Sequence, residues 1–292
     1  MTPGQVLLFA VGGLANAAYL FIVAAGLSLV FGALRVINMA HGSLYMIAAF
    51  VTVVIGNQLG AGLGFWGGML VAVAVAGAIG GVVEVLVLRR VYGREHLVQL
   101  LGTYAVSLII AGAVRIVFGA NYRTIVSPIP GHLDLGGYSY ASYSLFMIAA
   151  AIAIGCAVWA MLYRTSLGRN IRAAVADPDL LNATGVNVTR LYTTVFMIGA
   201  ALAGLGGSIV APSQAVGSSI DTDVLVLAFA ISVIGGLGSI VGSAVGALIV
   251  GMVISFGLVI PATNPFALAF VFIIMTAVLI VRPRGLFGLP ES

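Results

Sequence analysis

Long apolar stretches, separated by short polar connections, follow one another along almost the whole chain. Nine such runs occupy residues 5–33, 42–57, 64–88, 97–118, 143–163, 191–211, 224–238, 240–260 and 265–281. A helix needs about 20 predominantly apolar residues to cross a bilayer. The runs are too long for the strands of a membrane barrel, and they lack the alternation of such strands. The pattern predicts an all-α membrane protein, a polytopic bundle of eight or nine transmembrane helices, with the short run 224–238 leaving the count open.

The placement of the arginines predicts which connections face the cytoplasm. Three arginines lie within residues 89–94, four lie within 164–190, and two follow the last run at 282–284. Short cytoplasmic connections carry an excess of positive charge, so these three regions are expected inside. The connections 119–142 and 212–223 share a single arginine and are expected outside. Nine crossings, with the N-terminus outside and the C-terminus cytoplasmic, satisfy every connection, and no cleavable signal peptide is evident.

Two interruptions break the apolar pattern in corresponding places. The first is Arg35-Val-Ile-Asn-Met-Ala-His-Gly42 and the second is Gly235-Gly-Leu-Gly-Ser239, which suggests a weak internal repeat. Broken helices persist in a membrane only where protein or a water-filled cavity satisfies the freed backbone groups. Both breaks are therefore predicted to line a translocation path. The alternative is that they are tight cytoplasmic turns between adjacent helices.

Polar and small residues at these two breaks are the expected contacts for a transported solute. The predicted path residues are Asn38, His41, Gly42, Tyr45, Gly235, Gly236, Gly238, Ser239 and Ser243. The asparagine and histidine side chains can hydrogen-bond a zwitterion or an amide, and the glycines permit close backbone approach. For His41, a packing hydrogen bond to a neighbouring carbonyl is an equally simple interpretation.

The connection 164–190 contains the start of a short helix. Asp177 can cap free N–H groups, Pro178 suits the first helical position, and Asp179 suits the positive end of the helix dipole. Gly185 is a good terminating residue. A helix of two turns is too short to be stable alone, so we expect either a partner protein on it or packing against the bundle. The predicted docking surface consists of Arg169, Arg172, Asp177, Pro178, Asp179, Leu180, Leu181 and Gly185, with both leucines inserting into the partner.

The amino-acid composition excludes several classes of protein. The chain is 62% hydrophobic and 7% charged, with a mean hydropathy of +1.21, whereas soluble domains carry about 25% charged residues. All twelve basic residues are arginines, and without lysine the chain has neither a Walker A loop nor a Schiff-base site. The arginines lie at the ends of apolar runs, so membrane topology explains the basic charge and no nucleic-acid partner is expected.

Catalytic chemistry and ion coupling find little support in the sequence. Cys156 lies in an apolar run and is interpreted as a small core residue, and the three histidines are too scattered for a metal site. We expect no catalytic residue, no metal and no cofactor on this chain. A secondary transporter or a channel for a small neutral solute is the main alternative function. A secondary transporter usually needs ionisable residues deep in the bilayer. The single acid within a run, Glu84, lies five residues from Arg89, near the helix end, where it can pair or reach the surface.

A series of motifs, in this order and spacing, resembles the permease subunits of ABC importers for branched-chain amino acids over nearly the whole chain. They are Gly26-Leu-Ser-Leu-Val-Phe-Gly32, the two breaks, Gly168-Arg169 with Arg172-Ala173, Gly185-Val-Asn-Val188, Ala203-Gly-Leu-Gly-Gly207 and Arg282-Pro-Arg-Gly-Leu-Phe-Gly288. The family usually has an aromatic residue at the position of Met39. The general importer pattern of an acid six residues before a glycine matches Asp179 and Gly185, but Leu180 and Leu181 replace the usual two alanines.

The resemblance implies a single transmembrane permease domain, residues 1–292, in which the connection 164–190 is the cytoplasmic coupling loop. It implies two separate ATP-binding subunits that hold ATP and Mg, and a second homologous permease subunit in a heterodimer. A periplasmic solute-binding protein would deliver substrate near 119–142 and 212–223, and the location would be the bacterial inner membrane. ATP binding would close the ATPases, pull the coupling helix and switch the bundle between its two openings. Members of the family serve branched-chain amino acids, urea, short amides and aromatic acids, so the substrate stays open.

Overall fold

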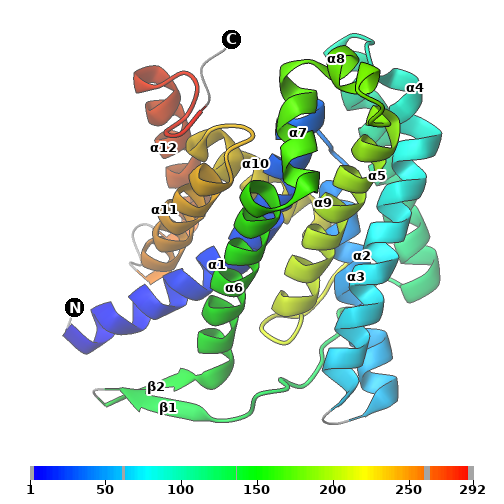
Figure 1. The fold of residues 1–292 in the computed structure, drawn as a ribbon. Helices are drawn as coiled ribbons and strands as arrows, with labels where there is room; N and C mark the ends of the chain where they lie inside the picture. Colours follow the sequence, from blue (N-terminus) through cyan, green and yellow to red (C-terminus); the bar gives the residue numbers. More distant parts are fainter. Residues whose placement is uncertain (1–2, 61–62, 136, 260–263, 289–292) are drawn as a thin grey trace.

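The computed structural model describes residues 3–60, 63–135, 137–259 and 264–288, and every predicted apolar run lies on a helix (Figure 1). The nine main helices are α1 (Pro3–Leu34), α2 (His41–Leu59), α3 (Leu63–Val83), α5 (His96–Phe118), α6 (Ser142–Arg164), α9 (Val188–Val210), α10 (Ile220–Gly235), α11 (Ile240–Val259) and α12 (Ala267–Val281). Among the described residues, seven helices are long and apolar enough to cross a membrane, while α10 and α12 are shorter. The chain is thus an all-α, multi-pass membrane protein, as the hydropathy pattern predicts.

Shorter elements connect these helices. A π-helix, η1 (Glu84–Leu88), continues α3 into α4 (Arg89–Val91), and a 3-10 turn, η2 (Asn264–Phe266), precedes α12. Two helices, α7 (Ser166–Ala176) and α8 (Pro178–Ala183), occupy the connection between α6 and α9. Strands β1 (His132–Leu135) and β2 (Tyr138–Ala141) form an antiparallel hairpin in which His132 pairs with Ala141.

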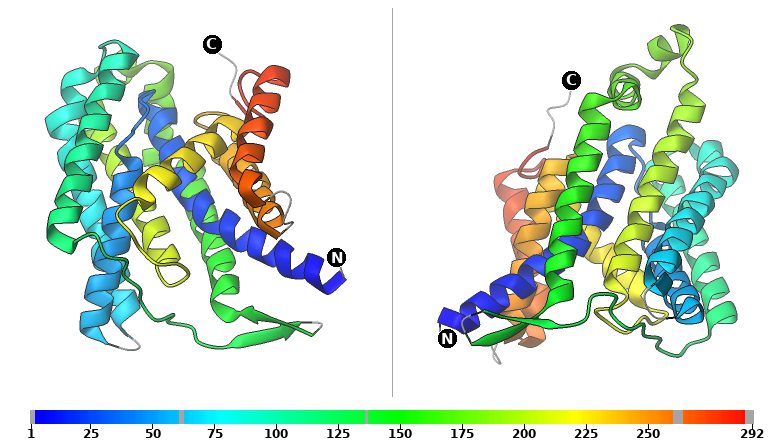
Figure 2. Two further views of the ribbon diagram at one scale, coloured as in Figure 1. Left: turned by 180° about the vertical axis from the view of Figure 1, so that it is seen from behind. Right: turned by 60° about the horizontal axis from the view of Figure 1, so that its bottom comes forward.

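Helix α1 runs obliquely through the middle of the bundle and contacts α6, α9, α10 and α11 (Figure 2). Small residues bring the helices close together. A Cβ atom added to Gly251 of α11 would lie 2.6 Å from the Gly13 carbonyl oxygen of α1. At Gly207 of α9, an added Cβ would overlap the Tyr45 carbonyl oxygen of α2. Such close backbone approach is typical of membrane helices, where packing rather than the hydrophobic effect holds neighbours together.

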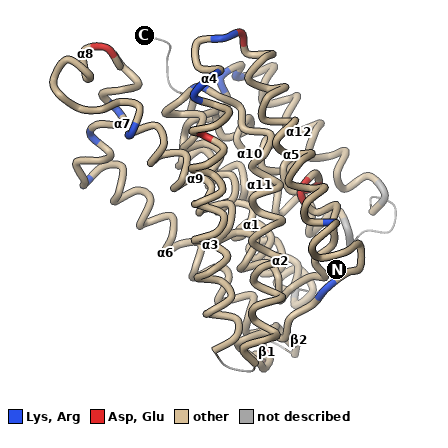
Figure 3. Tube along the Cα trace, turned by 90° about the vertical axis from the view of Figure 1, so that its right-hand side faces the viewer, with Lys and Arg blue, Asp and Glu red and all other residues tan. Residues whose placement is uncertain are grey.

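The connections sort to the two ends of the bundle. Helices α4, α7 and α8 and the end of α12 lie at one end with most of the arginines, while the N-terminal end of α1 and the hairpin lie at the other (Figures 1 and 3). The two connections predicted to face outside meet through a backbone pair. The Arg123 N–H donates to the Val216 carbonyl at 3.0 Å, and the Val216 N–H returns the bond to Arg123 at 2.8 Å. The predicted inside and outside connections are therefore separated in space.

Three local features differ from the sequence expectations. The β-hairpin and α7 are not predicted by the apolar pattern. The interpretation of Cys156 as a core residue is wrong, because its side chain is exposed on α6. Helix α6 is buried along a narrow stripe that includes Tyr143, Met147 and Ala151, and Cys156 lies off this stripe. In a membrane helix the lipid-facing side is as apolar as the packed side, so an apolar run does not identify a core position.

Candidate functional site

Helix α7 folds back sharply onto the end of α6. The Thr165 side chain accepts the Gly168 N–H at 3.2 Å and caps α7. A Cβ atom on Gly168 would overlap the Leu162 carbonyl, so glycine is required at this corner. The Arg172 guanidinium donates to the same Leu162 carbonyl and lies 5.2 Å above the Tyr163 ring. Arg172, predicted for docking, thus also closes the α6–α7 corner.

Helix α8 has the caps that its sequence predicts. The Asp177 carboxylate accepts the Leu180 N–H at 2.9 Å, Pro178 occupies the first position, and Gly185 has a φ of +90°, which favours glycine. Leu180 is 64% exposed, whereas Leu181 is 9% exposed and packs in the protein's own core. The prediction that both leucines insert into a partner is therefore wrong for Leu181. Consecutive residues on a helix point about 100° apart, so a helix packed against the bundle cannot present both.

The remaining predicted docking residues form one surface at the arginine-rich end. The surface, which we call the coupling surface, consists of the exposed residues Arg169, Arg172, Asp177, Pro178, Asp179, Leu180 and Gly185. Figure 3 shows the acidic residues at the tip of α8, with arginines nearby on and around α7. The arrangement offers one apolar side chain, Leu180, beside charges of both signs.

The first break is a segment that turns back into the bundle. Helix α1 ends at Leu34, and Arg35 has a φ of +54° while its N–H donates to the Phe31 carbonyl at 2.8 Å. His41, at the start of α2, then bonds through Nε2 to the Val23 carbonyl at 3.0 Å. Val23 precedes Leu34 by eleven residues, which is about 16 Å along a helix and about half the hydrocarbon thickness. Helix α2 therefore begins far from the end of α1, beside the middle of that helix.

The first break leaves two buried side-chain nitrogens, Asn38 Nδ2 and His41 Nδ1, without a hydrogen-bond partner among the described residues. The Asn38 Oδ1 accepts the Ala40 N–H at 3.1 Å, but its buried Nδ2 has no hydrogen-bond partner among the described residues. Thr103 of α5 satisfies the neighbouring backbone: its hydroxyl accepts from the Met39 N–H at 3.2 Å and lies 3.3 Å from the Ile37 carbonyl. Asn38 also lines a cavity of about 230 Å³. The other lining residues are apolar: Leu27, Ile37, Met39, Leu100, Leu225, Val226, Phe229, Ala230, Phe272 and Met275.

The other predicted residues of this break pack inside the protein. His41 is fully buried and has the carbonyl bond that the packing interpretation required. The Tyr45 hydroxyl, near the Gln214 amide, makes no hydrogen bond of ordinary geometry with a described residue. Gly42 brings the first turn of α2 against the first turn of α10, where an added Cβ would overlap the Asp221 carbonyl oxygen. Two helix N-termini thus meet beside the cavity.

Asp221 is a site residue that sequence reasoning places in an outer connection. The structure buries it to 7% exposure at the start of α10, with Oδ2 3.4 Å from the Ser43 hydroxyl. Ser43 in turn bonds the Ser107 hydroxyl of α5 at 2.9 Å. No arginine among the described residues lies within ion-pair distance of this carboxylate. The sequence signal was an acid three residues before a short apolar run, since α10 begins four residues earlier than predicted.

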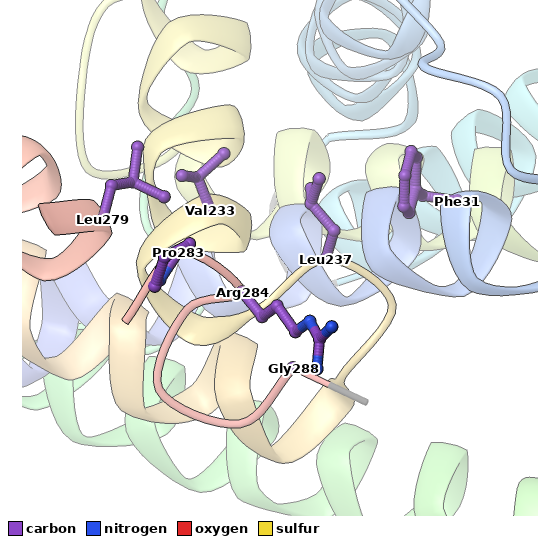
Figure 4. A pocket seen from close by; sticks show the side chains of 7 residues that line it. All are labelled: Phe31, Val233, Leu237, Leu279, Pro283, Arg284 and Gly288. Atoms are coloured by element: carbon purple, nitrogen blue, oxygen red, sulfur yellow. The ribbon is translucent and has the colours of Figure 1, made fainter. Parts of the chain in front are cut away.

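The second break lies at a different level, beside the last turn of α1. Its Gly238 approaches Gly32, while the carbonyls of Ile234 and Gly235 accept the N–H groups of Leu286 and Phe287 at 2.9 and 2.8 Å. The C-terminal segment thus satisfies the freed end of α10. A cavity of about 300 Å³ lies here (Figure 4). It is lined by Phe31, Val233, Leu237, Leu279, Pro283, Arg284 and Gly288.

The predicted path residues of the second break therefore form a group of their own. Ser243 bonds the Ser28 hydroxyl of α1 at 2.6 Å, and the Ser239 hydroxyl accepts the Gly242 N–H at 3.0 Å. Gly236 has a φ of +105° and packs against the C-terminal segment. This geometry is that of the tight turn that the sequence left as the alternative. Only the first break has both an unpartnered polar group and a cavity among the described residues.

Comparison with known proteins places the chain in a family. Residues 9–279 match the family described as the permease component of branched-chain amino acid transport systems. The high-affinity branched-chain amino acid permease protein BraD of Pseudomonas aeruginosa is 27% identical, covering 96% of this chain and 95% of its own. LivH of Escherichia coli is 29% identical over 92% and 91%, respectively.

A more distant relative carries another substrate in its name. The fructose import permease FrcC of Rhizobium meliloti is 31% identical over 51% of this chain and 39% of its own. No solved structure matches the chain significantly. Because the family match spans nearly all of the helical bundle, it confirms the resemblance that the motifs predicted. The chain belongs to the family of branched-chain amino acid ABC permeases.

Proposed function

We propose that this chain is the membrane subunit of an ATP-driven importer and forms the translocation path for a branched-chain amino acid or a related small amide or acid. The observation that carries the proposal is the coupling surface. A capped helix, α8, projects from the bundle with Asp179 and Leu180 exposed, on a chain that belongs to a permease family. The lysine-free sequence has no Walker A loop, so ATP and Mg belong on partner subunits.

We propose a topology of nine crossings in the bacterial inner membrane, with the N-terminus outside and the C-terminus in the cytoplasm. The grouping of arginines at one end of the bundle supports this orientation. The backbone pair between Arg123 and Val216, at the other end, supports an external position for both connections. The central place of α1 among helices from both halves of the chain supports one domain over residues 1–292.

Each end of the helical bundle is proposed to bind a different partner. Two ATP-binding subunits dock on the coupling surface, and a periplasmic solute-binding protein docks at the end that carries the β-hairpin. A second homologous permease subunit completes the membrane part as a heterodimer, within the lipid bilayer. The chain itself catalyses no reaction; it converts the closure of its ATPases into a change of access to the path.

The path passes the first break. The cavity beside Asn38 has apolar walls and one amide, which suit an apolar side chain and a hydrogen-bond acceptor such as a carboxylate or amide oxygen. The Asp221 carboxylate lies one turn of α10 before Leu225, which lines the cavity, and it suits an ammonium group. Both features favour an amino acid over a sugar or urea. We assign the second break to a structural turn.

The burial of Asp221 is the one observation that favours the alternative function, a secondary transporter. A buried carboxylate without a cationic partner is the kind of group that a proton-coupled secondary transporter uses. Glu84 does not serve this role, because it is paired with Arg89 at 3.1 Å near the arginine-rich end.

Reversing one charge on α8 distinguishes the two functions. We expect Asp179→Arg to abolish uptake and the stimulation of ATP hydrolysis in the complex with its ATP-binding subunits, while the protein stays in the membrane. Glu95→Arg, an exposed acid at the same end but outside the coupling surface, is the control and should leave both unchanged. Normal ATP-dependent uptake by Asp179→Arg would contradict the proposal. Uphill uptake by the purified chain without ATPases would establish the secondary transporter instead.

A further inference from the structure

A buried carboxylate at the junction of three elements has no role in the function proposed above. Glu84, the first residue of the π-helix η1, is fully buried. Its carboxylate accepts from Arg89 Nη2 of α4 at 3.1 Å, from the Tyr92 hydroxyl at 3.3 Å and from the Thr193 hydroxyl of α9 at 2.7 Å. Arg89 also donates to Thr193 at 2.8 Å, so Glu84, Arg89 and Thr193 form a closed triangle. We call this triangle, with Tyr92, the Glu84 cluster.

Stability alone is a poor explanation for this arrangement. The Glu84 carboxylate loses its hydration on folding, whereas the Arg89 side chain stays 39% exposed, and neither exposed nor buried ion pairs contribute much net stability. The cluster also begins a π-helix, a rare and unfavourable geometry that recurs at functional sites. Burial and the neighbouring Glu84 carboxylate raise the pKa of Tyr92 above its usual range, so its hydroxyl stays a donor to Glu84.

On one side, the cluster holds the helix that follows the coupling surface. Helix α9 begins at Val188, directly after the connection that contains α8, and Asn187 caps it by accepting the Arg190 N–H at 2.9 Å. Thr193 lies in the second turn of α9. The neighbouring Tyr192 ring packs edge-on against the Tyr92 ring, with centroids 5.8 Å apart. A displacement of α8 therefore reaches the Glu84 cluster through less than two turns of helix.

On the other side, the cluster is connected to the first break. The Gln99 side chain of α5 donates to the Val91 carbonyl at 3.3 Å and to the Arg94 carbonyl at 3.1 Å, which ties α5 to the end of α4. One turn further along α5, Thr103 holds the backbone of Met39 and Ile37. Leu100, between these two positions, lines the cavity beside Asn38. Hydrogen bonds and shared helices thus connect α9 to the first break.

We infer that the Glu84 cluster positions α4 and α5 relative to α9 and so transmits movement of the coupling surface to the Asn38 break. When the ATPases pull α8, α9 carries Thr193, the Glu84–Arg89 pair follows it, and α4 with α5 shifts Ile37 and Met39 at the cavity. The π-helix is the point where α3 changes its winding, because its wider turn allows adjustment without loss of all backbone hydrogen bonds. The inference rests on the proposed coupling role of α8.

The test separates ATP hydrolysis from transport in the reconstituted complex with its ATP-binding subunits and binding protein. Glu84→Gln keeps the shape of the side chain and removes its charge. We expect leucine uptake per ATP hydrolysed to fall by about tenfold, the scale of one charged hydrogen bond, while docking of the ATPases is unchanged. A merely structural role would lower the amount of folded complex and leave this ratio unaltered.

Neighbouring threonines on α9 supply a matched control. Thr193→Val removes the hydroxyl that bonds Glu84 and should lower the ratio, and Thr193→Ser should restore it. Thr194→Val removes a hydroxyl that bonds only within α9, to the Arg190 carbonyl at 2.9 Å, and should have no effect. If Thr193→Val and Glu84→Gln keep the normal ratio while Asp179→Arg abolishes docking, this inference is wrong and the coupling role stands. If Asp179→Arg is also without effect, the proposed function itself fails.

Discussion

Adding a single methyl group at Gly42 tests the close approach of α2 and α10 at the first break. A Cβ atom there would overlap the Asp221 carbonyl oxygen and lie 2.9 Å from the Leu225 Cβ. Carbon atoms pack at about 3.5–4.0 Å, so α2 and α10 must separate by at least about 0.6 Å. Such overpacking costs about 1–3 kcal/mol. Gly42→Ala should therefore lower the midpoint of thermal unfolding and also widen the junction of the two helix N-termini, which lowers uptake.

Gly112 provides the matched control for this substitution. It lies on α5, and an added Cβ would meet no atom within 4 Å, so Gly112→Ala introduces no clash. Replacing a helical glycine by alanine at such a position gains about 0.5–1 kcal/mol, and the midpoint should rise slightly. Thermal unfolding in detergent and uptake into vesicles should be measured for both variants. The midpoint of unfolding should fall for Gly42→Ala and rise for Gly112→Ala, and uptake should fall only for Gly42→Ala. Equal midpoints for the two variants would refute the close approach of α2 and α10.

Three further substitutions address the coupling surface and the path. Leu180 is 64% exposed, so Leu180→Ala should weaken binding of the ATPases without changing thermal stability. Leu181→Ala should instead destabilise the protein by about 2 kcal/mol. A binding titration and an unfolding curve distinguish the two variants, and equal effects in both assays would contradict the exposed position of Leu180 and the buried position of Leu181. Asp221→Asn should raise the KM for leucine uptake about tenfold at unchanged ATPase docking, because it removes the charge that we propose binds the ammonium group of the substrate. An unaltered KM would contradict this role of Asp221.

The helices were predictable because the membrane imposes their length. Every spanning segment must satisfy its backbone internally, so an apolar run of about 20 residues is almost enough to identify a helix. The caps of α8 were predictable for a local reason: Asp177, Pro178 and Gly185 act on backbone groups within a few residues of themselves. Predictions of this kind need no knowledge of what surrounds the helix.

Which side chains face lipid and which face the protein interior was not predictable, also because of the membrane. Lipid and protein interior are both apolar, so the runs gave no sign that Cys156 is exposed or that Leu181 is buried. The β-hairpin depends on pairing between residues nine positions apart, from His132 to Ala141, which hydropathy does not report. The distribution of arginines placed Asp221 in an external connection, because this rule considers only the charges of each connection. The burial of Asp221 depends instead on where α10 begins relative to α2, which the rule does not address.

The two breaks show what separates a path from a turn. In sequence both are interruptions of apolar runs, and their glycines and polar residues look equivalent. In the structure, the freed carbonyls of α10 at Ile234 and Gly235 are satisfied by backbone N–H groups of the C-terminal segment, which fixes that end. At the first break, the Met39 N–H donates to a side chain on another helix, the Thr103 hydroxyl, at 3.2 Å. A break held by a side chain on another helix can change when that helix moves, whereas the second break is held by two backbone hydrogen bonds from the C-terminal segment. This difference supports the proposal that the translocation path passes the first break and that the second break is a fixed turn between α10 and α11.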